Sequence, residues 1–105
     1  MSGSELIAYV GIADIHDGTI ARVVLEGNTA EVMIEGYSGR HHLILFEGVD
    51  SIEMNEPEGM LLYALCEMRA KPPLRRFVFA NNNDDDEGDQ KSLNIMALNY
   101  QIRSL

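Results

Sequence analysis

Three histidines and one aspartate are the first residues of this sequence that could do chemistry. His16 and Asp17 are adjacent, and His41 and His42 form a second pair. A metal-dependent hydrolase needs at least three ligands and an open position for water. Neighbours on a strand point to opposite faces, so only one of His41 and His42 could join the first pair in a site. A small metal-dependent hydrolase is therefore one functional hypothesis.

A tight turn is the simpler interpretation of His16 and Asp17. Gly18 follows them, and an Asp-Gly pair tolerates the positive φ angles of tight turns. Asp17 would accept backbone N–H bonds, while His16 would pack or bond to a carbonyl. We favour this interpretation, and we expect no catalytic, cofactor-binding or metal-binding residue in the chain.

Residues 81–90 form a polar stretch rich in carboxylates, with the run Asp84-Asp85-Asp86-Glu87-Gly88-Asp89. When an EF-hand calcium loop is aligned from Asn83, its twelfth position falls on Asn94, which lacks the required bidentate carboxylate. Like charges this close repel one another, so the stretch predicts a solvated loop. Whether it binds a divalent cation is left open.

The single cysteine, Cys66, gives no sign of nucleophilic chemistry. It lies in the apolar run 60–66, where a thiol behaves as a small hydrophobic side chain with a raised pKa. One cysteine cannot form an intrachain disulfide. The sequence also lacks a Gly-x-Ser-x-Gly motif, a phosphate-binding glycine loop and a dinucleotide fingerprint.

The charge balance argues against nucleic acid as a partner. The chain has 8 Lys and Arg against 17 Asp and Glu, a net charge of −9, which repels a phosphate backbone. We interpret its one basic cluster as a solvated turn; the cluster comprises Arg69, Lys71, Arg75 and Arg76.

Membrane insertion and secretion are not expected either. The longest apolar run, residues 60–66, is far shorter than the ~20 residues of a membrane helix. Residues 1–5 have no basic segment of a signal peptide. A cytoplasmic location follows, and a single reduced thiol agrees with it.

The elements that must position these residues are mostly strands. Residues 20–26 and 30–35 alternate around Gly27-Asn28, which predicts a β-hairpin with one apolar face. Further strands are predicted over 41–46, 49–54, 75–80 and, as one closing strand, 93–102. Residues 58–70 are ambiguous between helix and strand, and residues 3–10 could form a short helix or a first strand.

This pattern predicts one domain over residues 1–105 and a mainly β fold. We expect an antiparallel meander of about six to eight strands with at most one or two short helices. So many half-apolar strands need a second layer, so the meander would close as a small barrel or a two-layer sandwich.

The order of motifs resembles that of small bacterial domains of unknown function, some of which occur among toxin-immunity proteins. These domains begin with a His-Asp-(Gly or Ala) segment and continue as consecutive strands. The resemblance covers about residues 14–102 by this reading of strands and turns, and it favours strand over helix for 60–70. The segments that carry it are Ile15-His16-Asp17-Gly18-Thr19-Ile20, Phe46-Glu47-Gly48-Val49 and Arg75-Arg76-Phe77-Val78-Phe79-Ala80-Asn81.

Together these observations predict a non-enzymatic module of the bacterial cytoplasm that is structural or binds another protein. An immunity-like role would use its acidity against a basic partner. A monomer is slightly favoured over a homodimer. A dimer would use residues 60–68 or an apolar stripe of Met96, Leu98 and Tyr100 on an edge strand.

Overall fold

The computed structural model describes residues 6–81 and 91–105. Within them the chain forms nine strands and one short 3-10 turn, η2. The elements are β1 (Leu6–Val10), η2 (Ala13–Ile15), β2 (Thr19–Glu26), β3 (Thr29–Glu35), β4 (His41–Glu47), β5 (Ser51–Asn55), β6 (Leu62–Met68), β7 (Arg75–Asn81), β8 (Ser92–Ala97) and β9 (Asn99–Ser104).

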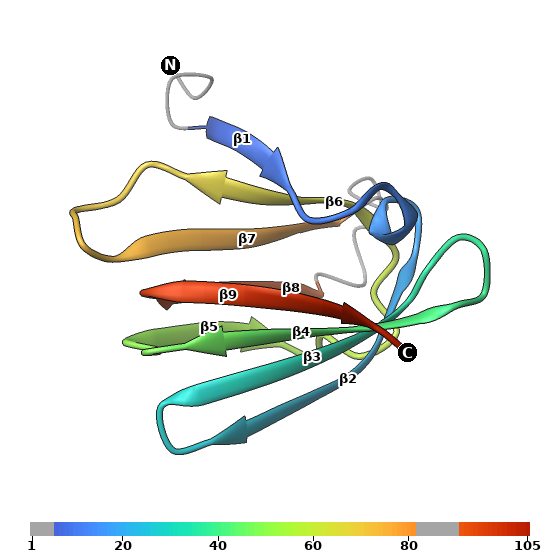
Figure 1. Cartoon of the computed structure of the whole chain (residues 1–105), viewed down its shortest axis with the longest axis horizontal. Helices are drawn as coiled ribbons and strands as arrows, with labels where there is room; N and C mark the ends of the chain where they lie inside the picture. The colour runs from blue at the N-terminus through green and yellow to red at the C-terminus, as the bar shows by residue number, and fades with distance from the viewer. Residues whose placement is uncertain (1–5, 82–90) are drawn as a thin grey trace.

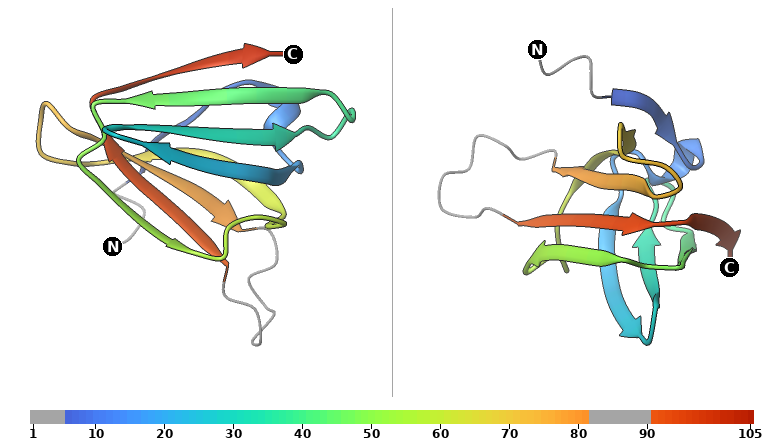
Figure 2. Two further views of the ribbon diagram at one scale, coloured as in Figure 1. Left: turned by 90° about the horizontal axis from the view of Figure 1, so that it is seen from below. Right: turned by 90° about the vertical axis from the view of Figure 1, so that its left-hand side faces the viewer.

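The strands make two antiparallel sheets, one over the other (Figures 1 and 2). One sheet has the order β1-β6-β7-β8-β5 and the other the order β2-β3-β4-β9. The mainly β prediction is confirmed, and the two open sheets fit a sandwich. They do not close on each other, so the barrel alternative has no support. The prediction of a meander is wrong, because β1 pairs with β6, β5 with β8 and β4 with β9, none of which are consecutive strands.

The core between the sheets centres on Phe46 of β4. Its ring is fully buried and meets Phe77 and Phe79 of the opposite sheet at centroid distances of 5.2 and 5.9 Å. The period-two pattern explains this arrangement, because alternate residues of each strand face inward. In β3 the inward set is Ala30, Val32 and Ile34, all fully buried.

The ambiguous segments are strands. Residues 62–68 form β6, whose Leu62, Ala64 and Leu65 are buried, so the helix alternative for 58–70 is wrong. Residues 6–10 form β1, which rules out a helix there as well. Pairing with neighbouring strands decides both cases, and such pairing has no signature in a short segment.

The prediction of one closing strand over 93–102 is wrong. The chain leaves the larger sheet at the end of β8 and joins the smaller one as β9. Ala97 is fully buried and Tyr100 packs on the core. These two residues are three positions apart, so one continuous strand could not turn both inward.

This change of sheet also removes the predicted dimer stripe. Met96 lies in β8. Leu98, the residue that joins β8 to β9, is about half exposed, and Tyr100 packs on Phe77. The three side chains do not share one face.

The turn predicted at His16-Asp17-Gly18 is confirmed, with Asp17 at a φ of 67°. Of the predicted acidic loop over residues 81–90, Asn81 belongs to β7 instead, and residues 82–90 lie outside the described residues, as does Asn83, from which the calcium loop is aligned. No helix in the described part of the chain is long and apolar enough to span a membrane.

Candidate functional site

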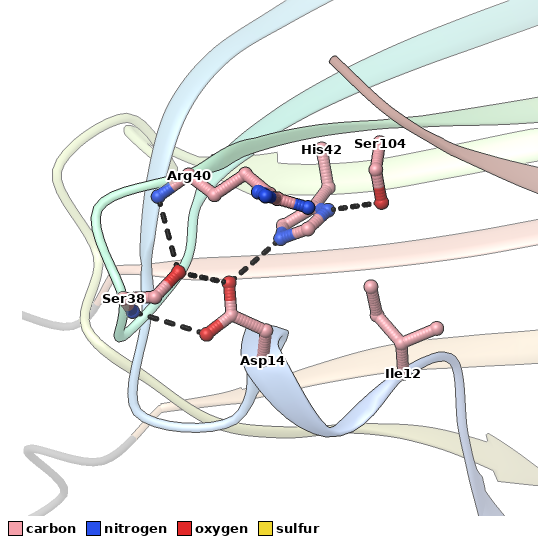
Figure 3. Close-up of a pocket in the computed structure, with 6 residues that line it drawn as sticks. All are labelled: Ile12, Asp14, Ser38, Arg40, His42 and Ser104. Atoms are coloured by element: carbon pink, nitrogen blue, oxygen red, sulfur yellow. Dashed lines mark hydrogen bonds and ion pairs between the residues drawn. The ribbon is translucent and has the colours of Figure 1, made fainter.

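A buried histidine connects three parts of the fold at one end of the smaller sheet. The His42 side chain on β4 is only 2% exposed. Its Nε2 lies 2.8 Å from Asp14 Oδ2 in η2, and its Nδ1 lies 2.9 Å from Ser104 Oγ in β9 (Figure 3). Ile12, Ser38 and Arg40 complete the wall of an open pocket of about 660 Å³.

Asp14 is the central acceptor of this network. It accepts hydrogen bonds from the Ser38 backbone N–H at 3.0 Å and from the Ser38 hydroxyl at 2.7 Å. The hydrogen bond with His42 is the largest cause that holds the pKa of Asp14 below its ordinary value, and the hydrogen bonds with Ser38 add to it. Gly36 makes this approach possible, since a Cβ there would lie 2.2 Å from an Asp14 oxygen.

The lowered pKa of Asp14 predicts an acid-sensitive stability. The contribution of its carboxylate is complete above the ordinary aspartate pKa and is lost as pH falls through the lower pKa of the folded state. Asp14→Asn should therefore be less stable than the wild type at about pH 6, and the difference should shrink towards about pH 2. Urea unfolding across this range measures it; a difference that does not change with pH would contradict the assignment.

The order Ser104, His42, Asp14 contains the residue types of a hydrolytic triad. Acyl transfer also needs N–H donors directed at a developing oxyanion. The Ser38 N–H is bonded to Asp14, and the Arg40 N–H is bonded to the Ser38 hydroxyl. The network therefore satisfies its own polar groups, and we interpret it as a structural link between η2, the β3–β4 turn and β9.

The other predicted histidines lie elsewhere. His41 points to the exposed outer face of the smaller sheet, opposite to His42, as expected for neighbours on a strand. His16 and Asp17 line a different pocket together with Tyr9 and Tyr63. Among residues 6–81 and 91–105, no three His, Cys, Asp or Glu side chains gather closely enough to hold a metal ion.

The pocket at His16 has aromatic walls. The Tyr9 ring meets His16 at a centroid distance of 6.4 Å and Tyr63 at 6.2 Å, with interplanar angles of 72° and 82°. Both tyrosines are 54% exposed. The pKa of Tyr9 is raised, chiefly by the charge that an ionised Tyr63 would place beside it. The pocket measures about 150 Å³.

The predicted basic cluster lies only partly in a turn, because Arg75 and Arg76 belong to strand β7. Arg75 donates two hydrogen bonds of 2.9 Å to Glu67, and its guanidinium lies 5.3 Å from the ring centre of Phe77. The hydrogen bond from Arg75 lowers the pKa of Glu67. This pair closes one end of the core rather than offering a free cation, which the run of charges in the sequence does not reveal.

Cys66 is buried, and burial raises the pKa of its thiol. The prediction of an unreactive, hydrophobic cysteine agrees with this environment.

The N-terminal strand β1 lies at one edge of the larger sheet. It pairs with β6 on one side, and no described strand pairs with the other. Ile7 and Tyr9 are 56% and 54% exposed. The other edge strands carry charges: Arg22 and Glu26 in β2, Glu53 in β5 and Arg103 in β9. β1 carries none.

Comparisons with protein-family models, curated proteins and solved structures find no match.

Four of these residues were missed by sequence reasoning. Asp14 and Ser104 are separated from His42 by 28 and 62 positions. The pairing of β4 with β9 brings Ser104 to His42, and the hydrogen bonds of η2 to the turn between β3 and β4 bring Asp14 there. Tyr9 and Tyr63 become neighbours through the pairing of β1 with β6. A prediction of these two strand pairings would have been the signal to find Ser104, Tyr9 and Tyr63.

Proposed function

We propose that this chain is a non-enzymatic protein-binding module that takes an extended segment of a basic partner along the free edge of β1. The observation that carries the proposal is the absence of charge on this exposed apolar edge. Proteins commonly place charges on edge strands to prevent pairing with other chains. An edge without them suits the addition of a strand, with main-chain hydrogen bonds supplying affinity.

The regular part of this edge is short. A bulge between Leu6 and Ala8 interrupts the pairing of β1 with β6, and regular register runs over Ala8, Tyr9 and Val10. A partner strand would therefore pair mainly along these residues, and the exposed side chain of Ile7 would flank it.

The partner's chemistry follows from the charge of the chain. A net charge of −9 attracts a basic surface, speeds encounter with it and repels a second copy of this chain. A basic toxin bound by an immunity protein would be one such partner. A second copy is the competing occupant, and sedimentation equilibrium separates the two. A species of 11.7 kDa supports the proposal, whereas a dimer lost on mutation of β1 would overturn it.

A lysine placed on β1 should weaken partner binding. Ala8→Lys adds to an exposed edge position the charge that blocks strand pairing, and we expect at least a tenfold loss of affinity, about 1.4 kcal/mol. Ser51→Lys, at an exposed position of the charged edge β5, makes the same change in net charge and should leave affinity unchanged.

The partner is first identified by photo-crosslinking in the host, with the reactive residue at Ile7 or, as control, at Met54 of β5. Affinities of both lysine variants are then measured with the purified partner. Crosslinks from Ile7 that disappear in Ala8→Lys support the proposal. Equal crosslinking from both positions, or equal affinity of both variants, would overturn it.

A further inference from the structure

The pocket between β1, β6 and the turn after η2 has a chemistry that strand pairing does not use. We infer that this pocket, bounded by Tyr9, His16, Asp17 and Tyr63, binds a methylated ammonium cation. The inference does not rest on the proposed function, because it concerns side chains rather than the backbone edge.

The ring arrangement is the first support. His16 and Tyr63 both stand nearly perpendicular to Tyr9, so the pocket has aromatic walls in different planes. Aromatic faces attract cations through the ring quadrupole, and cages of such rings bind quaternary ammonium groups. Walls in several planes fit a compact cation. The planar guanidinium of Arg75, elsewhere in the molecule, is held differently. It lies near the rings of Phe77 and Tyr100 and donates two hydrogen bonds to the Glu67 carboxylate.

The size of the pocket fits such a group. A cavity of 150 Å³ accommodates benzene, and this pocket has about the same volume. A methylated ammonium head has similar dimensions and an apolar, charged surface. It needs aromatic contact and one counter-charge rather than a set of hydrogen-bond acceptors.

Asp17 supplies that counter-charge from a fixed position. Its backbone N–H donates to the Leu62 carbonyl at 2.9 Å, and the Leu62 N–H donates to the Gly18 carbonyl at 2.8 Å. Gly18 is required in this loop, because a Cβ there would lie 2.6 Å from the Glu35 carbonyl oxygen. The carboxylate is exposed beside the rings, and the net charge of −9 favours cations over the whole molecule.

Choline and its uncharged isostere 3,3-dimethyl-1-butanol test this inference directly. Proton NMR of the whole chain should show saturable shifts of the Tyr9, Tyr63 and His16 rings with choline in the millimolar range, and none with the isostere. Tyr63→Ala should weaken choline binding at least tenfold, whereas Tyr63→Phe should retain it. Asp17→Asn, which tolerates the positive φ, should weaken it several-fold. Leu25→Ala, at an exposed position of β2 away from the pocket, is the control.

Absence of shifts with choline, or equal binding of the uncharged isostere, would overturn the inference. If choline bound Tyr63→Ala as tightly as the wild type, the site would lie elsewhere and the inference would also fail. Nα-acetyl-Nε-trimethyllysine amide distinguishes the source of the cation. Tighter binding of this probe than of choline indicates a modified protein side chain, and the reverse indicates a free small molecule. If Ala8→Lys loses the partner but retains choline, the edge and the pocket act separately.

Discussion

Replacing Phe46 by alanine is expected to lower the free energy of unfolding by about 3–5 kcal/mol. Phe46 is fully buried, and its ring is in contact range of Phe77, Phe79 and Tyr100, with centroid distances from 5.2 to 6.2 Å. The alanine would leave a cavity between the sheets, which the surrounding strands can fill only in part.

Urea unfolding followed by circular dichroism measures this change. Tyr37→Ala removes an aromatic ring that is 79% exposed, so its effect should stay within about 0.5 kcal/mol. A comparable loss in both variants would contradict the position of the core between the two sheets.

His42→Ala is expected to cost about 2–4 kcal/mol, because it removes a buried side chain and two hydrogen bonds together. Every buried side-chain nitrogen and oxygen of the described residues has a hydrogen-bond partner, and those of His42 are Asp14 and Ser104. Their loss releases η2 and the end of β9 from β4.

His41→Ala is the matched control, since it makes the same substitution one position away on the exposed face of the same strand. It should change stability by no more than about 0.5 kcal/mol. An equal loss of stability in His41→Ala and His42→Ala would contradict the placement of His42, and not His41, in the buried hydrogen-bond network.

Most of the strands could be predicted from the sequence, because their alternation records which face is buried. The hairpin of β2 and β3 is the clearest case, with Ala30, Val32 and Ile34 all inward. The division between β8 and β9 could also have been found, since Ala97 and Tyr100 break the period of two. The assignment of strands to two sheets could not, because it depends on pairing between distant segments.

The candidate sites were less predictable than the fold. The turn at Asp17 follows from local chemistry and was predicted. Its place beside Tyr9 and Tyr63 requires the pairing of β1 with β6, and β1 itself could not be distinguished from a helix in so short a segment. The hydrogen bond of His42 to Asp14 likewise joins η2 to β4 across 28 positions.

Hydrogen exchange of the complex with its purified partner tests the central proposal most directly. An added strand would protect the outward amides of β1 that no described strand now covers. We predict at least tenfold slower exchange within residues 6–10 on binding, unchanged exchange in β5, and no added protection in Ala8→Lys. Protection confined to other strands, or unchanged exchange in β1 when the partner is bound, would contradict the account.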